Sequence, residues 1–249
     1  MPDVPAYLRI AGDIRARIAS GEFPPGAKLP TESRIMADYD VSSTVAKWAM
    51  EMLKGEGLIE GRRGSGTYVR TVTRLVRDCP GRDQRTPSGV TAPFARDSSR
   101  AGHRGSWEHH SKHEAADLET ARRLALEPGA PVMATRYVFR ADDEPVQISH
   151  SREPLAITGG TPIEWPENGP VVGVVARMDS IGVRIDSVVE RVTSRAARPN
   201  EMEALAIGNR STQLLIIERT YYADDAPVET ADIAVPGHRY ELVYRLPIE

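Results

Sequence analysis

Apolar residues at helical spacing define the first structured segment of the chain. They recur at the i, i+3, i+4, i+7 positions that share one face of a helix. These positions are Tyr7, Ile10, Ala11, Ile14 and Ile18. Gly21 and the Pro24–Gly26 stretch then predict the end of this helix and an extended loop.

Two more short helices and a hairpin are predicted before residue 70. Thr31 is placed to cap a helix over 32–38, and Ser42 is placed to cap a third helix that runs to about residue 56. A glycine-rich turn at 61–66, between the short apolar runs 58–59 and 67–69, predicts a two-stranded hairpin. Three short helices followed by a basic hairpin are typical of a winged helix-turn-helix.

The third helix has a polar face that suits DNA. Thr44 and Lys47 lie away from the apolar positions Ala46, Met50 and Leu53, so they can enter a major groove. Glycines in the hairpin turn let the backbone approach a phosphate or the minor groove. A three-helix protein-interaction module with a solvated hairpin tip is the alternative that this pattern leaves open.

Three segments resemble the DNA-binding domain of the GntR family. They read PPGAKLPTE (24–32), VSSTVAKWAM (41–50) and LKGEGLIEGRRGSGTYV (53–69). Ser33 and Ser43 stand where the family usually has arginine. Lys47 also replaces an arginine and lacks its bidentate fork for guanine. The resemblance implies DNA contacts at Ser33, Ser43, Thr44, Lys47, Arg62, Arg63, Gly64, Ser65 and Gly66.

Composition divides the rest of the chain. We expect a DNA-binding domain over 1–72, a linker rich in Arg, Pro, Gly, Ser and Thr over 73–106, and a second domain over 107–249. The linker arginines could follow the DNA backbone, but solvated arginines are the more ordinary interpretation. His109, His110 and His113 lack a carboxylate or thiol at ligand spacing, so we expect no metal there.

The second domain shows a repeated pattern. Helix, strand, acidic turn and strand occur twice, with Ala-Asp-Asp-Glu-Pro-Val at 141–146 and Ala-Asp-Asp-Ala-Pro-Val at 223–228. Two such halves predict an α+β domain with a cleft between them, which is a common place for a ligand. The elements expected are helices at 117–126, 170–180 and 200–208, hairpins at 131–140/145–153 and 213–222/227–235, and strands at 183–195 and 239–246.

This half resembles the UTRA effector domain of the HutC branch of GntR regulators, on PVMATRYVFRADDEPVQISHSREP (131–154) and LLIIERTYYADDAPVETADIAVPGHRYEL (214–242). The resemblance implies an antiparallel sheet with flanking helices, like that of chorismate lyase, together with a small-molecule pocket and a homodimer. We expect Arg136, Ser149, Ser151 and Glu229 to bind the effector. An ion pair within the sheet is the alternative for Arg136.

The same resemblance bears on the charge of the effector. Family members that bind sugar phosphates place a second arginine two residues after the one matching Arg136, where this chain has Val138. Ser149 stands at the family's pocket glutamate. We therefore expect an effector that is less anionic than a phosphosugar.

Charge and composition limit the function classes. Residues 1–112 hold 18 basic against 13 acidic side chains, whereas 113–249 hold 14 against 22, so the two ends suit different partners. A single cysteine, no long apolar run and no signal-peptide pattern predict a cytoplasmic protein that does not enter a membrane.

No catalytic constellation, Walker loop or dinucleotide fingerprint is present, so we expect no catalytic residues and no cofactor. The sequence predicts a DNA-binding transcriptional regulator, specifically a repressor that a small-molecule effector releases from its operator. The alternative is an enzyme like chorismate lyase with an accessory DNA-binding domain.

Overall fold

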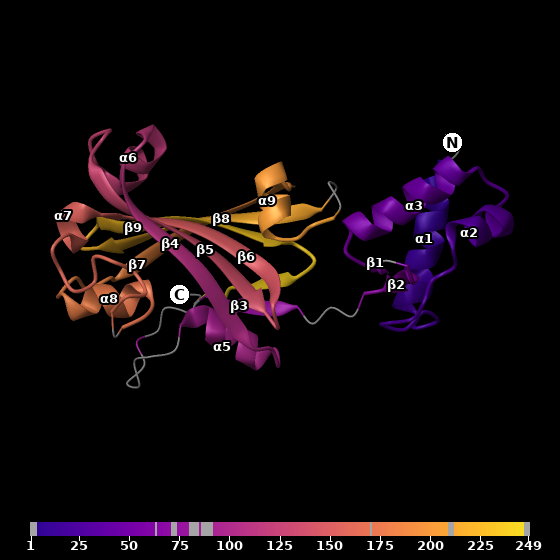
Figure 1. Cartoon of the computed structure of the whole chain (residues 1–249), viewed down its shortest axis with the longest axis horizontal. Helices are drawn as coiled ribbons and strands as arrows, with labels where there is room; N and C mark the ends of the chain where they lie inside the picture. The colour runs from indigo at the N-terminus through magenta and orange to yellow at the C-terminus, as the bar shows by residue number, and fades with distance from the viewer. Residues whose placement is uncertain are drawn as a thin grey trace.

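The N-terminal domain contains three helices and a hairpin. The computed structural model describes residues 4–62, 64–70, 74–79, 85, 92–169, 171–208 and 212–246. The domain consists of α1 (Ala6–Ala19), α2 (Glu32–Tyr39), α3 (Ser43–Gly55), β1 (Ile59–Arg62) and β2 (Gly66–Val69), and it lies at one end of the molecule in Figure 1. β1 and β2 pair antiparallel, which confirms the predicted winged helix-turn-helix.

Local capping explains where these helices start. The Thr31 hydroxyl accepts a hydrogen bond from the Arg34 amide, and the Ser42 hydroxyl accepts one from Val45. Each cap satisfies a backbone N–H that has no partner inside the helix. Asp40 adopts a left-handed conformation (φ 50°), which turns the chain sharply between α2 and α3. Both predicted caps are confirmed.

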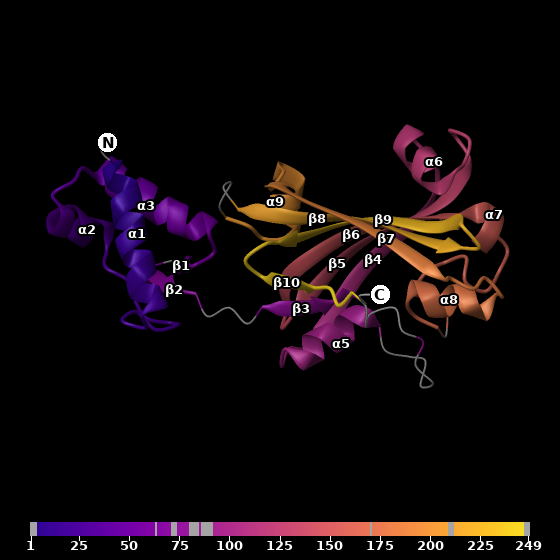
Figure 2. The ribbon, with the colours of Figure 1, turned by 180° about the vertical axis from the view of Figure 1, so that it is seen from behind.

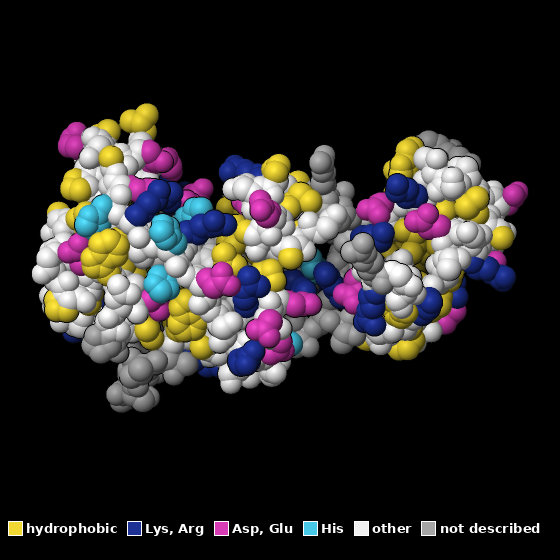
Figure 3. Space-filling view, in the orientation of Figure 1, with side chains coloured by type: hydrophobic (Ala, Val, Ile, Leu, Met, Phe, Trp, Pro, Cys, Tyr) yellow, Lys and Arg dark blue, Asp and Glu magenta, His cyan; other side chains and the backbone are white. Residues whose placement is uncertain are grey.

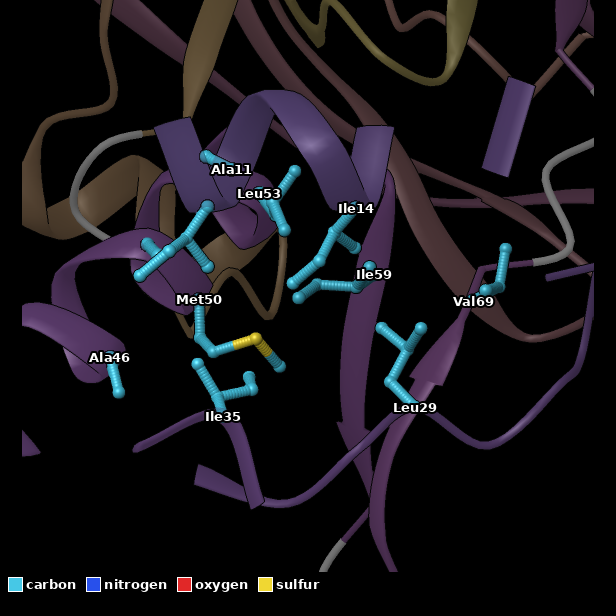
Figure 4. Close-up of a cluster of buried hydrophobic side chains, with 11 residues drawn as sticks. Ala11, Ile14, Leu29, Ile35, Ala46, Met50, Leu53, Ile59 and Val69 are labelled. Carbon is cyan, nitrogen blue, oxygen red and sulfur yellow. The ribbon is translucent and has the colours of Figure 1, made fainter. Parts of the chain in front are cut away.

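Buried side chains from all of these elements form one core in this domain (Figure 4). Ile10, Ala11 and Ile14 of α1 meet Met50 and Leu53 of α3. The helical spacing in the sequence therefore corresponds to the faces that pack together.

The C-terminal domain is built on a six-stranded antiparallel sheet with strand order β4-β5-β6-β9-β8-β7 (Figure 1). The strands are β4 (Gly105–Ala115), β5 (Pro131–Ala141), β6 (Glu144–Pro154), β7 (Ser187–Ala196), β8 (Gln213–Ala223) and β9 (Ala226–Pro236). The two repeated hairpins, β5–β6 and β8–β9, meet through β6 and β9 at the centre.

The acidic turns of the two hairpins have the same backbone form. Asp142 and Asp143 have φ values of 48° and 70°, and Asp224 and Asp225 have values of 50° and 62°. Two consecutive residues with positive φ give the tight turn whose twist fits a two-residue hairpin, and aspartate tolerates it. The predicted internal repeat is confirmed.

Each hairpin also contains a β-bulge near its turn. In the first hairpin, Phe139 pairs with Gln147 but Arg140 pairs with Pro145, so Val146 is the extra residue. In the second, Val228 is extra in the same position. A bulge shifts the pairing of the two strands by one residue. Side chains that would face opposite sides of the sheet then face the same side.

Different elements cover the two faces of the sheet (Figures 1 and 2). On one face lie α6 (Leu118–Leu124) and α9 (Pro199–Ala204). On the other lie α5 (Pro93–Arg100), α8 (Val174–Ser180) and a parallel pair of short strands, β3 (Leu75–Asp78) and β10 (Tyr240–Val243). The short helix α7 (Leu155–Thr158) follows β6.

The structure differs from the sequence prediction in four elements. β3 and α5 fall within the predicted linker 73–106, but β3 pairs with β10 and α5 packs on β3 and β4, so both belong to the C-terminal domain. The edge strand β4 was not predicted at all. The helix predicted over 200–208 is α9, which begins at Pro199 and ends at Ala204, with Arg198 at its N-cap. Within the described ranges, none of the helices is both long and apolar enough to cross a bilayer.

Candidate functional site

The recognition helix α3 exposes the polar side chains that the sequence predicted. Ser43, Thr44 and Lys47 are exposed, whereas Ala46 and Met50 are buried against α1 and α2. Because Ser42 caps the helix, the first amide groups of α3 and its positive dipole end also face this surface. The arrangement provides donors for phosphate and for base edges.

The wing adds a second polar surface. Arg62 lies over the ring of Tyr68, with its guanidinium carbon 4.4 Å from the ring centroid, and it donates to Glu60. Gly64 and Gly66 have φ values of 72° and 118°, a conformation that side chains disfavour. Ser65 is exposed at the tip. Arg63 lies outside the described residues.

A cavity of about 600 Å³ lies in the C-terminal domain, between the sheet and the elements that cover its lower face in Figure 2. Side chains from β5, β6, β8 and β9 form its floor, and α5, α8 and β3 supply residues to its walls. This volume falls within the usual range of about 300–1,000 Å³ for small-molecule pockets.

One wall of the cavity is aromatic. Phe139 lies 4.9 Å from Phe94 and 5.4 Å from Tyr137, and it is 6.3 Å from Trp107 (ring centroids). Trp107 and Tyr137 each donate a hydrogen bond to the Glu167 carboxylate. Burial, followed by the nearby Glu167 charge, raises the pKa of Tyr137, so its hydroxyl stays protonated. This wall suits a flat apolar group.

A buried ion pair closes one side of the cavity. Arg177 of α8 donates to both carboxylate oxygens of Glu153, at 2.6 and 3.0 Å, and also to the carbonyl of Ile163. Burial alone would lower the pKa of Arg177, but the Glu153 carboxylate outweighs it and raises the pKa. Arg177 therefore stays charged, and its two hydrogen bonds to Glu153 hold the pair in one geometry.

A second pair lies on the sheet floor. Arg219 donates to Oε1 of Glu229 at 3.2 Å and stacks on Tyr221 at 4.4 Å. Glu229 is fully buried, and its Oε2 has no hydrogen-bond partner among the described residues. Burial raises the pKa of Glu229 to about 7, with Arg219 opposing the shift. At neutral pH this carboxyl therefore changes protonation readily.

A third pair joins the short strand β3 to the sheet. Arg77 is 2% exposed and donates from Nη2 to Oε1 of Glu190 on β7. Burial disfavours the Glu190 carboxylate, but the Arg77 charge prevails and lowers its pKa. Tyr244 donates to the other carboxylate oxygen.

Three of the four predicted effector residues line the cavity. Ser149, Ser151 and Glu229 face it together, as strand residues two apart should. Arg136 is exposed on the opposite face, in register between His110 and His150. The prediction that Arg136 stands at the cleft is wrong, because the bulge at Val146 places Tyr137, not Arg136, opposite Ser149.

Arginines that the sequence analysis did not select lie in the cavity instead. The repeat contains a signal for one of them. Arg219 lies four residues before Ala223, and the residue four before Ala141 is Tyr137. The two hairpins thus place an arginine and a tyrosine at equivalent cavity positions, which Arg136 does not share.

On the opposite, open face of the sheet, basic and histidine side chains gather between α6 and α9 (Figure 3). His113 on β4 pairs with Glu164 and stacks on Trp165. The described part of the chain contains no group of three potential metal ligands.

Comparisons with known protein families give two matches, one in each domain of the fold. Residues 6–69 match the family described as bacterial regulatory proteins, gntR family. Residues 101–241 match the UTRA domain.

A solved structure described as a putative GntR-family transcriptional regulator is 44% identical, with a TM-score of 0.69 and 98% of each chain covered. PhnF from Mycobacterium smegmatis shares the fold at 18% identity and a TM-score of 0.61, over 96% of this chain and 100% of that one. The HTH-type transcriptional regulator Rv0792c of Mycobacterium tuberculosis is 24% identical over 98% of this chain and 87% of its own length.

Shorter matches extend over a small part of the relative. The chain covers 28% of the mannosyl-D-glycerate transport/metabolism system repressor MngR of Escherichia coli, at 42% identity. It covers 20% of the regulator YdfD of Bacillus subtilis, at 35% identity.

Proposed function

Because the chain belongs to the GntR family of transcriptional regulators and carries a UTRA domain, we propose that it represses transcription as a homodimer and leaves its operator when a small molecule fills the C-terminal cavity. It is a DNA-binding transcriptional regulator. What we propose is that the regulation is repression, that a small molecule relieves it, and that the residues named below bind the DNA and the effector.

The observation that carries this proposal is the cavity itself. It lies in a domain separate from the DNA-binding helices, and it buries charged groups around about 600 Å³ of space. Buried ionised groups are unfavourable unless they are paired or used, and their collection in a pocket indicates a ligand site. Ser149, Ser151 and Glu229 are the residues proposed to contact the effector.

The DNA contacts are proposed at exposed residues of two surfaces. The N-terminal turn of α3 would enter the major groove, and the wing would follow the adjacent backbone. The described residues proposed for this role are Ser33, Ser43, Thr44, Lys47, Arg62, Gly64, Ser65 and Gly66, all of them exposed.

Replacing Lys47 tests this surface. We expect Lys47→Ala to weaken operator binding by about 1–3 kcal/mol if the ammonium contacts a base, which is about 5- to 150-fold in affinity. The operator is first selected from a random duplex pool with the full-length protein. Gel-shift titrations at one fixed salt concentration then compare the variants, because phosphate contacts depend strongly on salt.

Lys54→Ala is the matched control on the same helix. Lys54 lies near the C-terminal end of α3, where it pairs with Glu51 at 2.8 Å. Recognition helices contact bases mainly through their N-terminal part, so this variant should bind the operator like wild type. Equal losses for both lysines, or none for either, would contradict the proposed orientation of α3.

The homodimer is proposed on two grounds. One winged domain contacts too little DNA for tight specific binding, whereas two half-sites multiply specificity. In addition, the edge strand β7 exposes Val188, Val189 and Val192 at 40%, 44% and 41%. An exposed apolar edge strand favours pairing with another chain.

Charges on this edge should therefore separate the dimer. We expect Val188→Asp/Val192→Asp to be monomeric in light scattering of the full-length protein, while wild type is dimeric. Val4→Asp, which changes an exposed valine of the DNA-binding domain, should stay dimeric. A wild-type monomer would refute the dimer, and a dimer that survives both aspartates would place the interface elsewhere.

Membership of a regulator family supports a binding role rather than catalysis for the C-terminal domain, because fold likeness to an enzyme carries no activity by itself. A cytoplasmic location is part of the same proposal, since the operator is there.

A further inference from the structure

The buried guanidinium of Arg77 has hydrogen-bond donors that no described residue accepts. Its Nη2 donates to Glu190, but neither Nε nor Nη1 has a hydrogen-bond acceptor among the described residues. The side chain is 2% exposed and lines the cavity. A buried donor without an acceptor is unfavourable, so an acceptor placed in the cavity would gain affinity by binding there.

The charge of the cavity favours an anionic acceptor. Five arginines and four carboxyl groups line it among the described residues, and Glu190, the partner of Arg77, adds a fifth carboxylate beside it. One of the carboxyl groups, Glu229, is partly protonated near neutral pH. Five arginines thus face five carboxyl groups, and protonation of Glu229 leaves the balance slightly positive, while the free N–H donors of Arg77 favour a carboxylate.

The aromatic wall restricts the rest of the ligand. Phe94, Trp107, Tyr137 and Phe139 offer ring faces and edges, not a row of hydroxyl or amide groups such as a sugar requires. A flat, mostly apolar body with one acidic group fits this combination of wall and guanidinium.

We propose that Arg77 is an effector-binding residue and that the effector is a small organic carboxylic acid with a planar apolar body. The proposal rests on the function proposed above, because it names the ligand class of the same cavity. The acid group is bound by the free N–H donors of Arg77, and the body lies against Phe139 and its aromatic neighbours.

The position of Arg77 in the chain gives its binding a regulatory consequence. β3 is the first element after the wing strand β2, so the residue that holds the ligand lies where the chain enters the C-terminal domain, next to the connection between the two domains. β3 is attached to the C-terminal domain by a four-residue parallel pairing with β10. A ligand bound to Arg77 adds a further attachment for this strand.

A second chain segment leads from the cavity to the DNA-binding domain. β9 carries Glu229 in the cavity and ends at Pro236. Shortly after it, His238 contacts the guanidinium of Arg70, and its ring packs on Gly57 at the end of α3. The cavity is thus linked to the DNA-binding domain through two segments: β3, and the segment that follows β9.

The test compares acids with their neutral amides. Phenylacetate and 3-phenylpropionate, their primary amides, and glucose 6-phosphate are titrated into the full-length protein by calorimetry. We expect wild type to bind an acid about 10- to 100-fold more tightly than its amide, the range of one charge-assisted hydrogen bond. Wild type that binds neither acid, binds amides equally well, or prefers glucose 6-phosphate overturns the ligand class.

The variant Arg77→Gln/Glu190→Gln removes the guanidinium without leaving a buried unpaired carboxylate. It should fold, bind the selected operator like wild type, and lose the preference for acid over amide. It should also stay on the operator when the acid is added. Arg122→Gln, on the exposed face of α6, should keep both responses. An unchanged preference in the double variant would overturn the role of Arg77.

Ser149→Phe separates this proposal from the function on which it rests. The larger side chain projects from the floor next to Tyr137 and takes up space against the aromatic wall, so it should weaken binding of every probe. Weaker binding in Ser149→Phe together with an unchanged preference in the Arg77 variant would retain the effector cavity and reject Arg77. Undiminished binding in Ser149→Phe would reject the cavity itself.

Discussion

Arg177→Ala should unfold the C-terminal domain at much lower denaturant concentration than wild type. Arg177 and Glu153 are 3% and 1% exposed, and the arginine also serves the carbonyl of Ile163. Its removal leaves a buried carboxylate without its partner, a change that typically lowers the free energy of unfolding by about 3–5 kcal/mol. In a domain of this size, that shift corresponds to a melting temperature lower by about 6–20 °C.

Two further variants separate the charge from the packing. Arg177→Met/Glu153→Leu replaces the pair with apolar groups of similar volume and should recover much of the lost stability. Arg122→Ala breaks the exposed pair with Glu119 and should leave the unfolding midpoint unchanged. Urea unfolding followed by tryptophan fluorescence measures all three. A double variant as unstable as the single one would show that shape, rather than the unpaired charge, determines the loss.

The bulge at Val146 places one candidate site residue, Arg136, outside the cavity. A two-residue turn at 142–143 continued without interruption would pair Arg136 with Ser149 and place them on one face. The extra residue Val146 shifts this pairing by one, and Tyr137 takes the place of Arg136. A bulge of this kind has no reliable sequence signal, since it depends on the packing of the whole hairpin. Periodicity predicted the strands but not their relative register.

Elements that are stabilised by packing against distant parts of the chain could not be predicted from local sequence patterns either. β3 and α5 are short and lie in a segment rich in arginine and proline, so local composition indicated a linker. β3 depends on β10, which is distant in the sequence, and α5 packs on β4, a strand that the sequence analysis did not predict. By contrast, α2 and α3 were predicted because their caps, Thr31 and Ser42, act within the next three residues.

The internal repeat gives the cavity its two different walls. Equivalent positions counted from the two turns hold Tyr137 and Arg219, and Gln147 and Glu229. At these positions the first hairpin supplies a tyrosine and a glutamine, whereas the second supplies an arginine and a glutamate. Because β6 and β9 pair at the centre of the sheet, both sets face the same space. A symmetric fold thus forms an asymmetric site, which is what recognition of an asymmetric small molecule requires.

Glu229→Gln should remove a pH dependence of stability that wild type shows between about pH 4.5 and pH 7. Glu229 is fully buried, and burial raises its pKa from the usual 4.5 to about 7, while Arg219 and Arg123 oppose the shift and Glu153 supports it. Below pH 4.5 the carboxyl is neutral in both the folded and the unfolded chain, so it has no effect. As the pH rises to 7, the unfolded chain ionises freely, but the folded protein ionises only against the burial of the charge.

Wild type should therefore lose roughly 3 kcal/mol of unfolding free energy relative to Glu229→Gln between pH 4.5 and pH 7.5, and the difference should stay constant above that. The histidines are present in both proteins, so their contributions cancel in the comparison. Glu127→Gln, which removes an exposed carboxyl, should follow the wild-type curve. Urea unfolding at half-unit pH intervals measures all three proteins. Parallel curves for wild type and Glu229→Gln would show that the carboxyl is ionised throughout and fully stabilised by Arg219.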